Sequence, residues 1–354
     1  MKACNVEIFD AQMNYICHDV IETPMIDNDY LAADTTTISI NRFVDIPKNG
    51  YIWIRGDFSF FGFITDSVTD DEQTTINFLP FINKFDQEVL FDTDLQGGGD
   101  SLETVLGSFI DSYWKHNSDA LQNIPIVILD PSSETTNWGF NLKTDTEGMH
   151  HCIINFYDVL LRRSLTKYGI TMTIMPSPND RTIRLSIGAP SGTPYIDADL
   201  PNVVVDTFKV NQAGRTTNKM VIWNAANYRD KVEYYLHPDG SYDTTNSDRI
   251  TPVVSDVSSV MPNDEKPFPV VAAENAASTF SGIEWTNEIK LIVQNDDPII
   301  TPADMAIGQQ VKIIRNGIEY TTLLTGKVLD YETTLIFGTI RLDLTKKIKM
   351  ERKG

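Results

Sequence analysis

The chain has 354 residues, of which 41% are hydrophobic and 22% are charged. These values are close to those of ordinary globular proteins, and the length predicts two to three domains. The 29 basic residues are outnumbered by 49 acidic residues, which gives a net charge of −20. Affinity for nucleic acid comes mainly from lysine and arginine side chains at the phosphates, so this excess of acidic residues argues against a protein that binds DNA in a sequence-specific way.

The termini and the cysteines also limit the possible classes. The sequence contains no run of 18 apolar residues and does not open on an apolar leader. We therefore expect no stable membrane insertion and synthesis in a cytosol. Cys4, Cys17 and Cys152 are odd in number and unevenly spaced, so we expect reduced, buried thiols rather than disulfides or a zinc site.

Residues 1–95 predict a first β-barrel domain. Short runs of β-branched and aromatic residues at 6–9, 37–40, 51–54, 60–64 and 75–78 indicate strands. Asn49-Gly50 and Gly56-Asp57 are typical of hairpin turns. The aromatic side chains of this region should alternate between a barrel core and a packed outer face, although they also suit a sugar groove: Trp53, Phe58, Phe60, Phe61 and Phe63.

Residues 96–199 predict an α/β domain. A glycine-rich break at 97–99 precedes apolar residues that recur at helical spacing from Leu102 to Tyr113, with Asp100 and Glu103 placed like a capping box. A strand is expected at 126–129 and a second helix at about 153–168, ended by Gly169. A hairpin follows, with strands at 170–174 and 182–187.

The remaining residues again predict strands. We expect a second, discontinuous β-barrel domain built from residues 200–235 and 300–346, interrupted by an insertion at 236–299. A helical turn is expected within 272–277, and residues 347–354 form a basic C-terminal tail. The expected fold is therefore mainly β with α+β insertions, with two related antiparallel β-barrel domains, the second discontinuous, and α/β insertion domains.

An internal repeat connects the two barrels. Residues 54–76 align with 314–336 without a gap, and eight of the 23 aligned positions are identical. The identical pairs are Ile54/Ile314, Arg55/Arg315, Thr65/Thr325, Val68/Val328, Asp70/Asp330, Glu72/Glu332, Thr74/Thr334 and Ile76/Ile336. The repeat predicts that one β-meander occurs twice, and the strand edges around Arg55 and Arg315 become candidate interfaces.

Several residue clusters are candidates for a metal or catalytic site. Asp92, Asp94, Gly97 and Glu103 have the spacing of a calcium-binding EF-hand loop, but Gln96 departs from it, and a linker with a helix cap is the alternative. His150-His151-Cys152 and Cys17-His18-Asp19 lack the spacing of a metal or nucleophile site. No catalytic motif is present and nothing singles out a carboxylate pair, so we predict no catalytic, cofactor-binding or metal residues.

Two ends of the chain resemble a known family. The opening residues 6–10 and several C-terminal segments resemble the tail-tip, or baseplate hub, proteins of siphophages, which are similar in fold to the hub of contractile phages. The C-terminal segments are Trp285-Thr286-Asn287-Glu288-Ile289, Asn295-Asp296-Asp297, Ile307-Gly308-Gln309-Gln310-Val311 and Phe337-Gly338-Thr339-Ile340-Arg341-Leu342.

The resemblance implies a structural function. Such hubs are homotrimers whose six barrels dock on the hexameric distal tail protein, close the tail tube and open to release DNA, with other baseplate or tape-measure proteins as further partners. The resemblance implies no enzyme activity and a location at the tail tip of a virion assembled in the bacterial cytoplasm. The alternatives are a carbohydrate-active or peptidoglycan-degrading enzyme with a carboxylate pair, an adhesin or sugar-binding module, and the hub of a contractile injection system.

Overall fold

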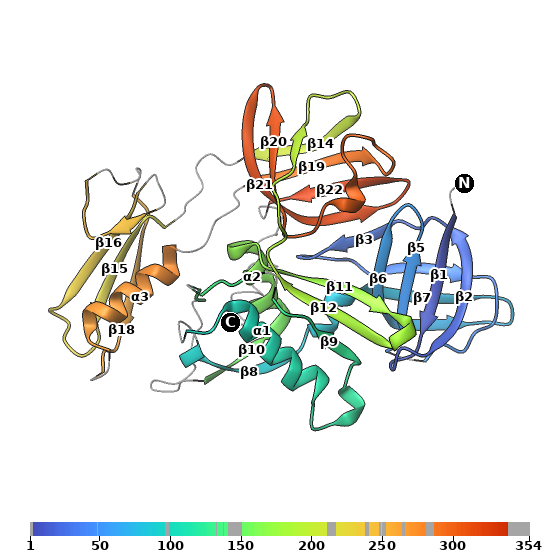
Figure 1. Cartoon of the computed structure of the whole chain (residues 1–354), viewed down its shortest axis with the longest axis horizontal. Coiled ribbons are helices and arrows are strands. Elements are labelled where there is room, and N and C mark those ends of the chain that lie inside the picture. The colour runs from blue at the N-terminus through green and yellow to red at the C-terminus, as the bar shows by residue number, and fades with distance from the viewer. Residues whose placement is uncertain are drawn as a thin grey trace.

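A computed structural model gives the arrangement of the chain (Figure 1). It describes residues 3–47, 49–95, 99–131, 133–136, 138–140, 151–210, 217–237, 241–247, 249, 253–263, 266–280 and 287–338. Two curled sheets flank a mixed α/β region, and a fourth part carries its own small sheet and helix (Figure 1). Within these residues no helix is both long and apolar enough to cross a membrane.

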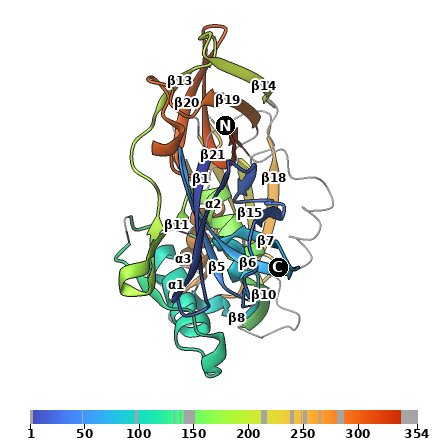
Figure 2. The ribbon, with the colours of Figure 1, turned by 90° about the vertical axis from the view of Figure 1, so that its right-hand side faces the viewer.

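The first curled sheet has six strands, and every neighbouring pair is antiparallel. In pairing order they are β2 (Tyr15–Glu22), β1 (Ala3–Phe9), β5 (Tyr51–Arg55), β6 (Ser59–Thr69), β7 (Thr74–Pro80) and β4 (Thr36–Ile40). Alternate side chains enter a closed apolar core, as period-two sequences require. Arg42, just after β4, contacts the edge strand β2 through the carbonyl of His18 and the carboxylate of Asp19, so the two edges of the sheet approach each other and the sheet curls into an open barrel. The first barrel faces the viewer in Figure 2.

The second curled sheet has seven strands. In pairing order they are β13 (Tyr195–Asp197), β20 (Gln310–Arg315), β21 (Ile318–Leu329), β22 (Glu332–Phe337), β19 (Asn287–Gln294) and β14 (Val203–Val210), and β3 (Ile26–Asp29) also pairs with β21. All pairs are antiparallel except β13 with β20. Phe208 on the edge strand β14 lies 5.2 Å from the Tyr320 ring on β21, which curls this sheet as well.

Strand pairing changes the expected boundaries of the second barrel. Residues 219–224 and 231–235 were expected in it, but they pair in a separate sheet, whereas residues 287–294 were expected in the insertion and instead pair with β22. Residues 26–29 and 195–197, expected in the first two domains, also join the second sheet. The strand pairing differs from the expected assignment at these strands because alternation indicates a strand but does not determine its partner.

The repeat is present in the structure and is longer than the sequence alignment indicated. β4, β5, β6 and β7 pair in the same order and directions as β19, β20, β21 and β22. Each unit carries a β-bulge at the same place, between Ile64 and Asp66 in β6 and between Leu324 and Gly326 in β21. The hydroxyls of the bulge residues, Thr65 and Thr325, donate to carbonyls of Asn77 and Ile336 on the neighbouring strands.

The ladders also correct the ungapped alignment. Arg55 pairs with Ser59 across residues 56–58, whereas Arg315 pairs with Ile318 across the shorter turn 316–317. The second turn is shorter by one residue as well, because Thr69 pairs with Thr74 and Leu329 with Thr333. A one-residue shift reverses the face of every side chain. The equivalent residues on the outer two strands are therefore Ile54 and Ile313, Thr74 and Thr333, and Phe78 and Phe337, all of them buried.

The α/β region contains two small sheets and two helices. Its elements are β8 (Glu88–Asp92) with β10 (His151–Asn155), β9 (Ile126–Ile128) with β12 (Thr182–Gly188) and β11 (Thr171–Ser177), and the helices α1 (Leu102–Ile110) and α2 (Arg162–Tyr168). Short 3-10 turns here are η1 (Phe81–Phe85), η2 (Thr93–Leu95), η4 (Ala120–Gln122) and η6 (Pro178–Asp180), and the π turns are η3 (Asp111–Lys115) and η5 (Phe156–Leu161). A further 3-10 turn, η7 (Pro302–Asp304), lies before β20 in the second barrel.

Local expectations in this region were partly right. The helix from Leu102 and the αL residue Gly169 are confirmed. Ser101, not Asp100, caps α1, because its hydroxyl accepts from Thr104 N at 3.2 Å. The second helix begins later than expected, since residues 151–155 pair with β8, and Asn49-Gly50 does not close a hairpin because β4 pairs with β7.

The fourth part has its own core. β17 (Tyr242–Asp243), β16 (Lys231–Leu236), β15 (Lys219–Asn224) and β18 (Ser255–Val260) form a sheet against α3 (Phe268–Phe280). Met220 and Ile222 of the sheet pack against Ala272 and Ala276 of the helix. The expected helical turn at 272–277 lies within α3. The glycine-rich residues 97–98 and the basic tail 347–354 fall outside the described residues.

Candidate interaction surfaces

The calcium hypothesis centred on Asp92, Asp94 and Glu103. Glu103 is buried, and its carboxylate accepts from Ser133 Oγ at 2.8 Å and from Thr135 N at 2.9 Å. It therefore holds the 133–135 segment against α1. Gln96 and Gly97 are outside the described residues, and among those described no group of three His, Cys, Asp or Glu side chains is arranged to hold a metal ion.

The histidine and cysteine clusters divide between two faces of their strands. On β2, Cys17 points into the barrel core and burial raises the pKa of its thiol, whereas His18 lies outside with its Nδ1 2.6 Å from Tyr15 Oη. On β10, Cys152 is buried and His151 is exposed, while His150 is not among the described residues. All three cysteine side chains are buried, as expected. Adjacent residues on a strand point apart, so His18 lies on the opposite face of β2 from Cys17, and His151 on the opposite face of β10 from Cys152.

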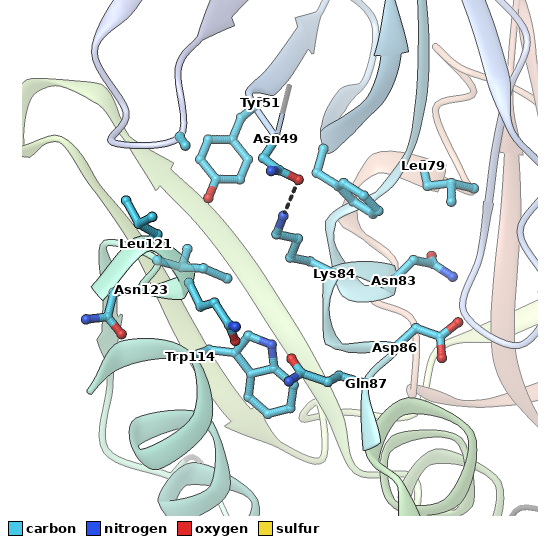
Figure 3. Close-up of a pocket in the computed structure, with 14 residues that line it drawn as sticks. Asn49, Tyr51, Leu79, Asn83, Lys84, Asp86, Gln87, Trp114, Leu121 and Asn123 are labelled. Carbon is cyan, nitrogen blue, oxygen red and sulfur yellow. Dashed lines mark hydrogen bonds between the residues drawn. The ribbon is translucent and has the colours of Figure 1, made fainter. Parts of the chain in front are cut away.

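A hollow of about 660 Å³ lies between the first barrel and the α/β region (Figure 3). Lys84 points across it and donates to Asn49 Oδ1 at 3.1 Å, and burial lowers the pKa of this lysine (Figure 3). Among the described residues that line the hollow, Asp86 is the only carboxylate, and it accepts from Asn155 Nδ2 at 2.6 Å. Glycoside hydrolysis needs two carboxylates that flank one bond, and the hollow does not supply them.

The aromatic side chains of the first barrel divide as expected. Phe58 and Phe60 lie in the barrel core, and Phe61 is buried on the outer face with Trp53 and Phe63 packed beside it. η1 and the α/β region pack against that outer face, where Phe61 contacts Phe81, and Phe63 lines the hollow. These rings begin a series of ring contacts that continues through Tyr51, Phe81, Phe85, Trp114 and Phe156.

Arg55 and Arg315 were expected to mark equivalent edges, but the ladders place them one residue out of register. Arg55 forms an ion pair with Glu7 and lies 4.2 Å from the Trp53 ring on the outside of the first barrel. Arg315 donates to Ala198 O at 3.2 Å and lies over Phe208. Each arginine therefore stabilises its own sheet, and they are not a matched pair.

The two barrels are joined by residues 22–31. β3 leaves the first barrel and pairs with residues 326–329 of β21, and Leu329 packs in the core of the first barrel beside Ile26. Tyr331 Oη donates to Glu22 Oε1 at 2.6 Å, and Tyr157 Oη of the α/β region donates to Tyr30 O at 2.7 Å. These bonds connect the two barrels and the α/β region, and the sequence alone gave no signal for them.

Within the described part of the chain, we single out two surfaces as candidates for contact with a partner. Leu90 and Ile153 face each other across β8 and β10 and are 54% and 69% exposed. The second surface is the end of β6, residues 66–69, where Val68 is 62% exposed. Paired exposed apolar side chains and uncovered strand edges are the features that protein partners bury.

Comparison with known proteins identifies the fold. No family model and no curated protein matches the sequence. The crystal structure of the tail protein from Neisseria meningitidis MC58 is similar, with a TM-score of 0.51 over 95% of this chain and 97% of that protein, at 11% identity. This chain has the fold of that tail protein.

Two further solved structures are similar at lower scores. They are the 43 kDa tail protein of prophage MuSo2 from Shewanella oneidensis (TM-score 0.48, 10% identity, 95% of this chain and 98% of that one) and a chain of the P2 virion baseplate in its activated conformation (TM-score 0.46, 12% identity, 94% and 98%). The expected mainly-β fold, with two related barrels of which the second is discontinuous, is confirmed.

Proposed function

We propose that this chain is a structural hub at the tip or baseplate of a phage or prophage tail. In this proposal three copies form a ring that caps the tail tube, docks on the hexameric ring of the distal tail protein and opens for DNA release. The protein works through broad contacts and is not an enzyme. It belongs to the virion and assembles in the cytoplasm of the bacterial host.

The observation that carries the proposal is the duplicated four-strand unit, β4–β7 and β19–β22, with its bulge at the same place in both copies. The two units are held in one chain by β3 and by Leu329 in the first core. A trimer alone cannot meet six identical sites with equivalent contacts, whereas three chains with two related units each present six. The fold shared with a bacterial tail protein supports the same assignment.

The net charge of −20 is consistent with a protein that surrounds the path of DNA without holding it. A wall of carboxylates repels a polyanion, and binding would require the counterion release that lysine and arginine provide.

The mass of the particle in solution tests the proposal. The 39.8 kDa chain should assemble as a trimer, and the trimer should bind a purified hexameric distal tail ring but not a dissociated tail subunit. Electron microscopy of tails should place it at the distal end. A chain that stays monomeric, both alone and with the ring, would contradict the proposal.

Zymography on bacterial cell walls separates the hub from a wall-degrading enzyme. A lane of this protein should leave the wall intact, while a known hydrolase in the next lane clears it. A cleared band at the mass of this chain would favour the enzyme alternative and would direct attention to its carboxylates.

A further inference from the structure

We infer that the C-terminal half of β6, residues 66–69, is the edge on which a neighbouring copy of this chain adds an extended strand. The inference rests on the proposed trimer and names the contact that would join its subunits. The contact is expected because the equivalent edge in the second barrel is already occupied within the chain.

The occupied edge is on β21. Residues 318–323 of this strand pair with β20, and after the bulge its residues 326–329 pair with β3. The bond from Tyr30 N to Thr325 O, 3.2 Å long, extends this ladder to the bulge. On one side of β21, the residues before the bulge therefore pair with β20 and the residues after it pair with β3. β3 is a short strand that comes from the first barrel.

The equivalent edge on β6 lacks that second partner. Residues 59–63 pair with β5, and Ile64 N donates to Gly50 O at 2.8 Å. Beyond the bulge, among the strands that the structure describes, residues 66–69 pair only with β7. In an ordinary sheet such an edge is a template for another strand.

The inner face of this half-strand is covered in both barrels, so only the edge differs. In the second barrel Lys327 Nζ donates to Pro302 O at 2.6 Å and also to Met305 O, which holds the loop before β20. In the first barrel Ser67, 260 positions earlier, donates to Ile46 O of the loop before β5, and Thr69 donates to Val44 O at 3.1 Å. The loops match in the two barrels, and beyond the bulge β7 is the only strand among the described residues that pairs with β6.

The alternating direction of the backbone N–H groups along β6 identifies which of them face the open edge. Asp70 N donates to Gln73 O at 2.9 Å and closes the β6–β7 hairpin. Because the backbone groups of an antiparallel strand alternate in direction, the N–H groups of Asp66 and Val68 face β7. Those of Ser67 and Thr69 face the open edge. On β21 the backbone carbonyl of Thr325 faces β3, and by the same alternation the backbone groups of Lys327 and Leu329 face β3 as well.

A ring of two alternating units explains why the occupant is a second copy. In the proposed ring of six barrels, three of the contacts between neighbouring barrels lie within a chain, where β3 pairs with the edge of β21. The other three contacts must join barrels of different chains. The strand that arrives at β6 differs in charge from β3. Gly326 lies against Asp29, whereas the equivalent residue on β6 is the exposed Asp66, followed by Asp70 and Asp71. Like charges opposite one another are destabilising, so the arriving segment carries neutral or basic side chains opposite Asp66.

Proline and alanine at position 67 test the inference. Ser67→Pro removes one N–H from the open edge and leaves the ladder with β7, while the matched control Ser67→Ala loses the same hydroxyl but keeps the N–H. Measured by mass in solution, Ser67→Ala should assemble like the wild type. Ser67→Pro should assemble at least tenfold more weakly, with an unchanged circular dichroism spectrum.

Hydrogen exchange on the wild type gives a second measurement that does not depend on a variant. The amides of Ser67 and Thr69 should exchange more slowly in the trimer than in the dissociated chain. A wild-type trimer in which both amides exchange at the same rate as in the monomer, or a Ser67→Pro chain that assembles fully, would overturn the inference and leave the proposed hub intact. A wild type that never assembles would overturn both.

Discussion

Lys327 is a buried cation that holds a loop instead of meeting an anion. Its side chain is 8% exposed and donates to the carbonyls of Pro302 and Met305. Burial lowers its pKa to about 8, and Asp304 opposes this shift without cancelling it. Burial of the ammonium group costs desolvation free energy. Its two hydrogen bonds to carbonyls offset part of that cost and fix the chain before β20.

Lys327 predicts a dependence of stability on pH. Because its folded pKa lies near 8 and the ordinary value is 10.5, the unfolded chain binds more protons between these values. The free energy of unfolding should therefore rise with pH, by about 2 kcal/mol between pH 7.5 and 9.5 from this group.

Urea unfolding at those two pH values measures the rise in the wild type. Lys327→Met should lose it, while Lys312→Met, at a half-exposed lysine on β20, should keep it. An equal rise in the wild type and in Lys327→Met would show that other groups carry the dependence.

Buried threonines mark the repeat at the same scale. Thr74 Oγ1 donates to Arg42 O at 2.9 Å, and the equivalent Thr333 Oγ1 donates to Asn295 Oδ1 at 2.7 Å. In both barrels the acceptor belongs to the segment that follows the outermost strand of the unit, β4 or β19. Both threonines are buried, so each hydroxyl needs a hydrogen-bond partner within the protein.

Among the elements, β21 shows how one strand serves two partners. Its bulge turns the second half of the strand toward β3, and Gly326 stands where the two backbones meet. A Cβ atom on this residue would lie 3.0 Å from the Cα and Cγ of Asp29. The absence of a side chain therefore permits the close approach that joins the barrels.

Two glycine substitutions should have opposite effects. Gly326→Ala should destabilise the protein by about 1–3 kcal/mol, because the added methyl group displaces β3. Gly107→Ala should stabilise it by up to about 1 kcal/mol, because Gly107 is in α1 and the new methyl group would make ordinary contacts with Ile128 and Ile187. Thermal unfolding of both variants checks the signs, and a Gly326→Ala chain as stable as the wild type would mean that β3 moves freely.

In the whole molecule, the first barrel and the α/β region share one apolar core, whereas the sheet that packs on α3 has a core of its own. One core runs from the outer face of the first barrel through Phe81 and Phe85 to Trp114 and Phe156 of the α/β region. A separate small core lies in the sheet that packs on α3. The first barrel and the α/β region should therefore unfold together, whereas the α3 part should open on its own.

Truncating one residue in each core tests this division. Phe85→Ala removes ring contacts at 5.0 Å to Trp114 and 5.7 Å to Phe81, and should cost about 3–5 kcal/mol and loosen both the barrel and the α/β region. Ile222→Ala should speed hydrogen exchange only in residues 219–224, 231–236, 255–260 and 268–280. Faster exchange in the first barrel after Ile222→Ala would contradict separate cores.

Sequence reasoning succeeded where local pattern decides structure. Alternation in β1, β5 and β6 specified the strands, and helical spacing specified α1, because each face must alternate or repeat to bury its apolar side. It also detected the repeat through Thr65/Thr325 and Val68/Val328, which lie on the strand that carries the bulge. It misplaced Ile54 and Ile76 by one residue, because two turns are shorter in the second copy and an ungapped comparison hides such changes.

The sequence by itself determined that this protein is rich in strands, carries one unit twice and has an acidic surface, since all three follow from residue types and their spacing. Only the tertiary structure decided which strands share a sheet, that β3 crosses into the second barrel, and that no described strand other than β7 pairs with the end of β6. Pairing joins residues that are far apart in the sequence, such as Ile26 and Leu329, which are 303 positions apart. No local pattern encodes such a partner, because any amphipathic strand can in principle add to any open edge.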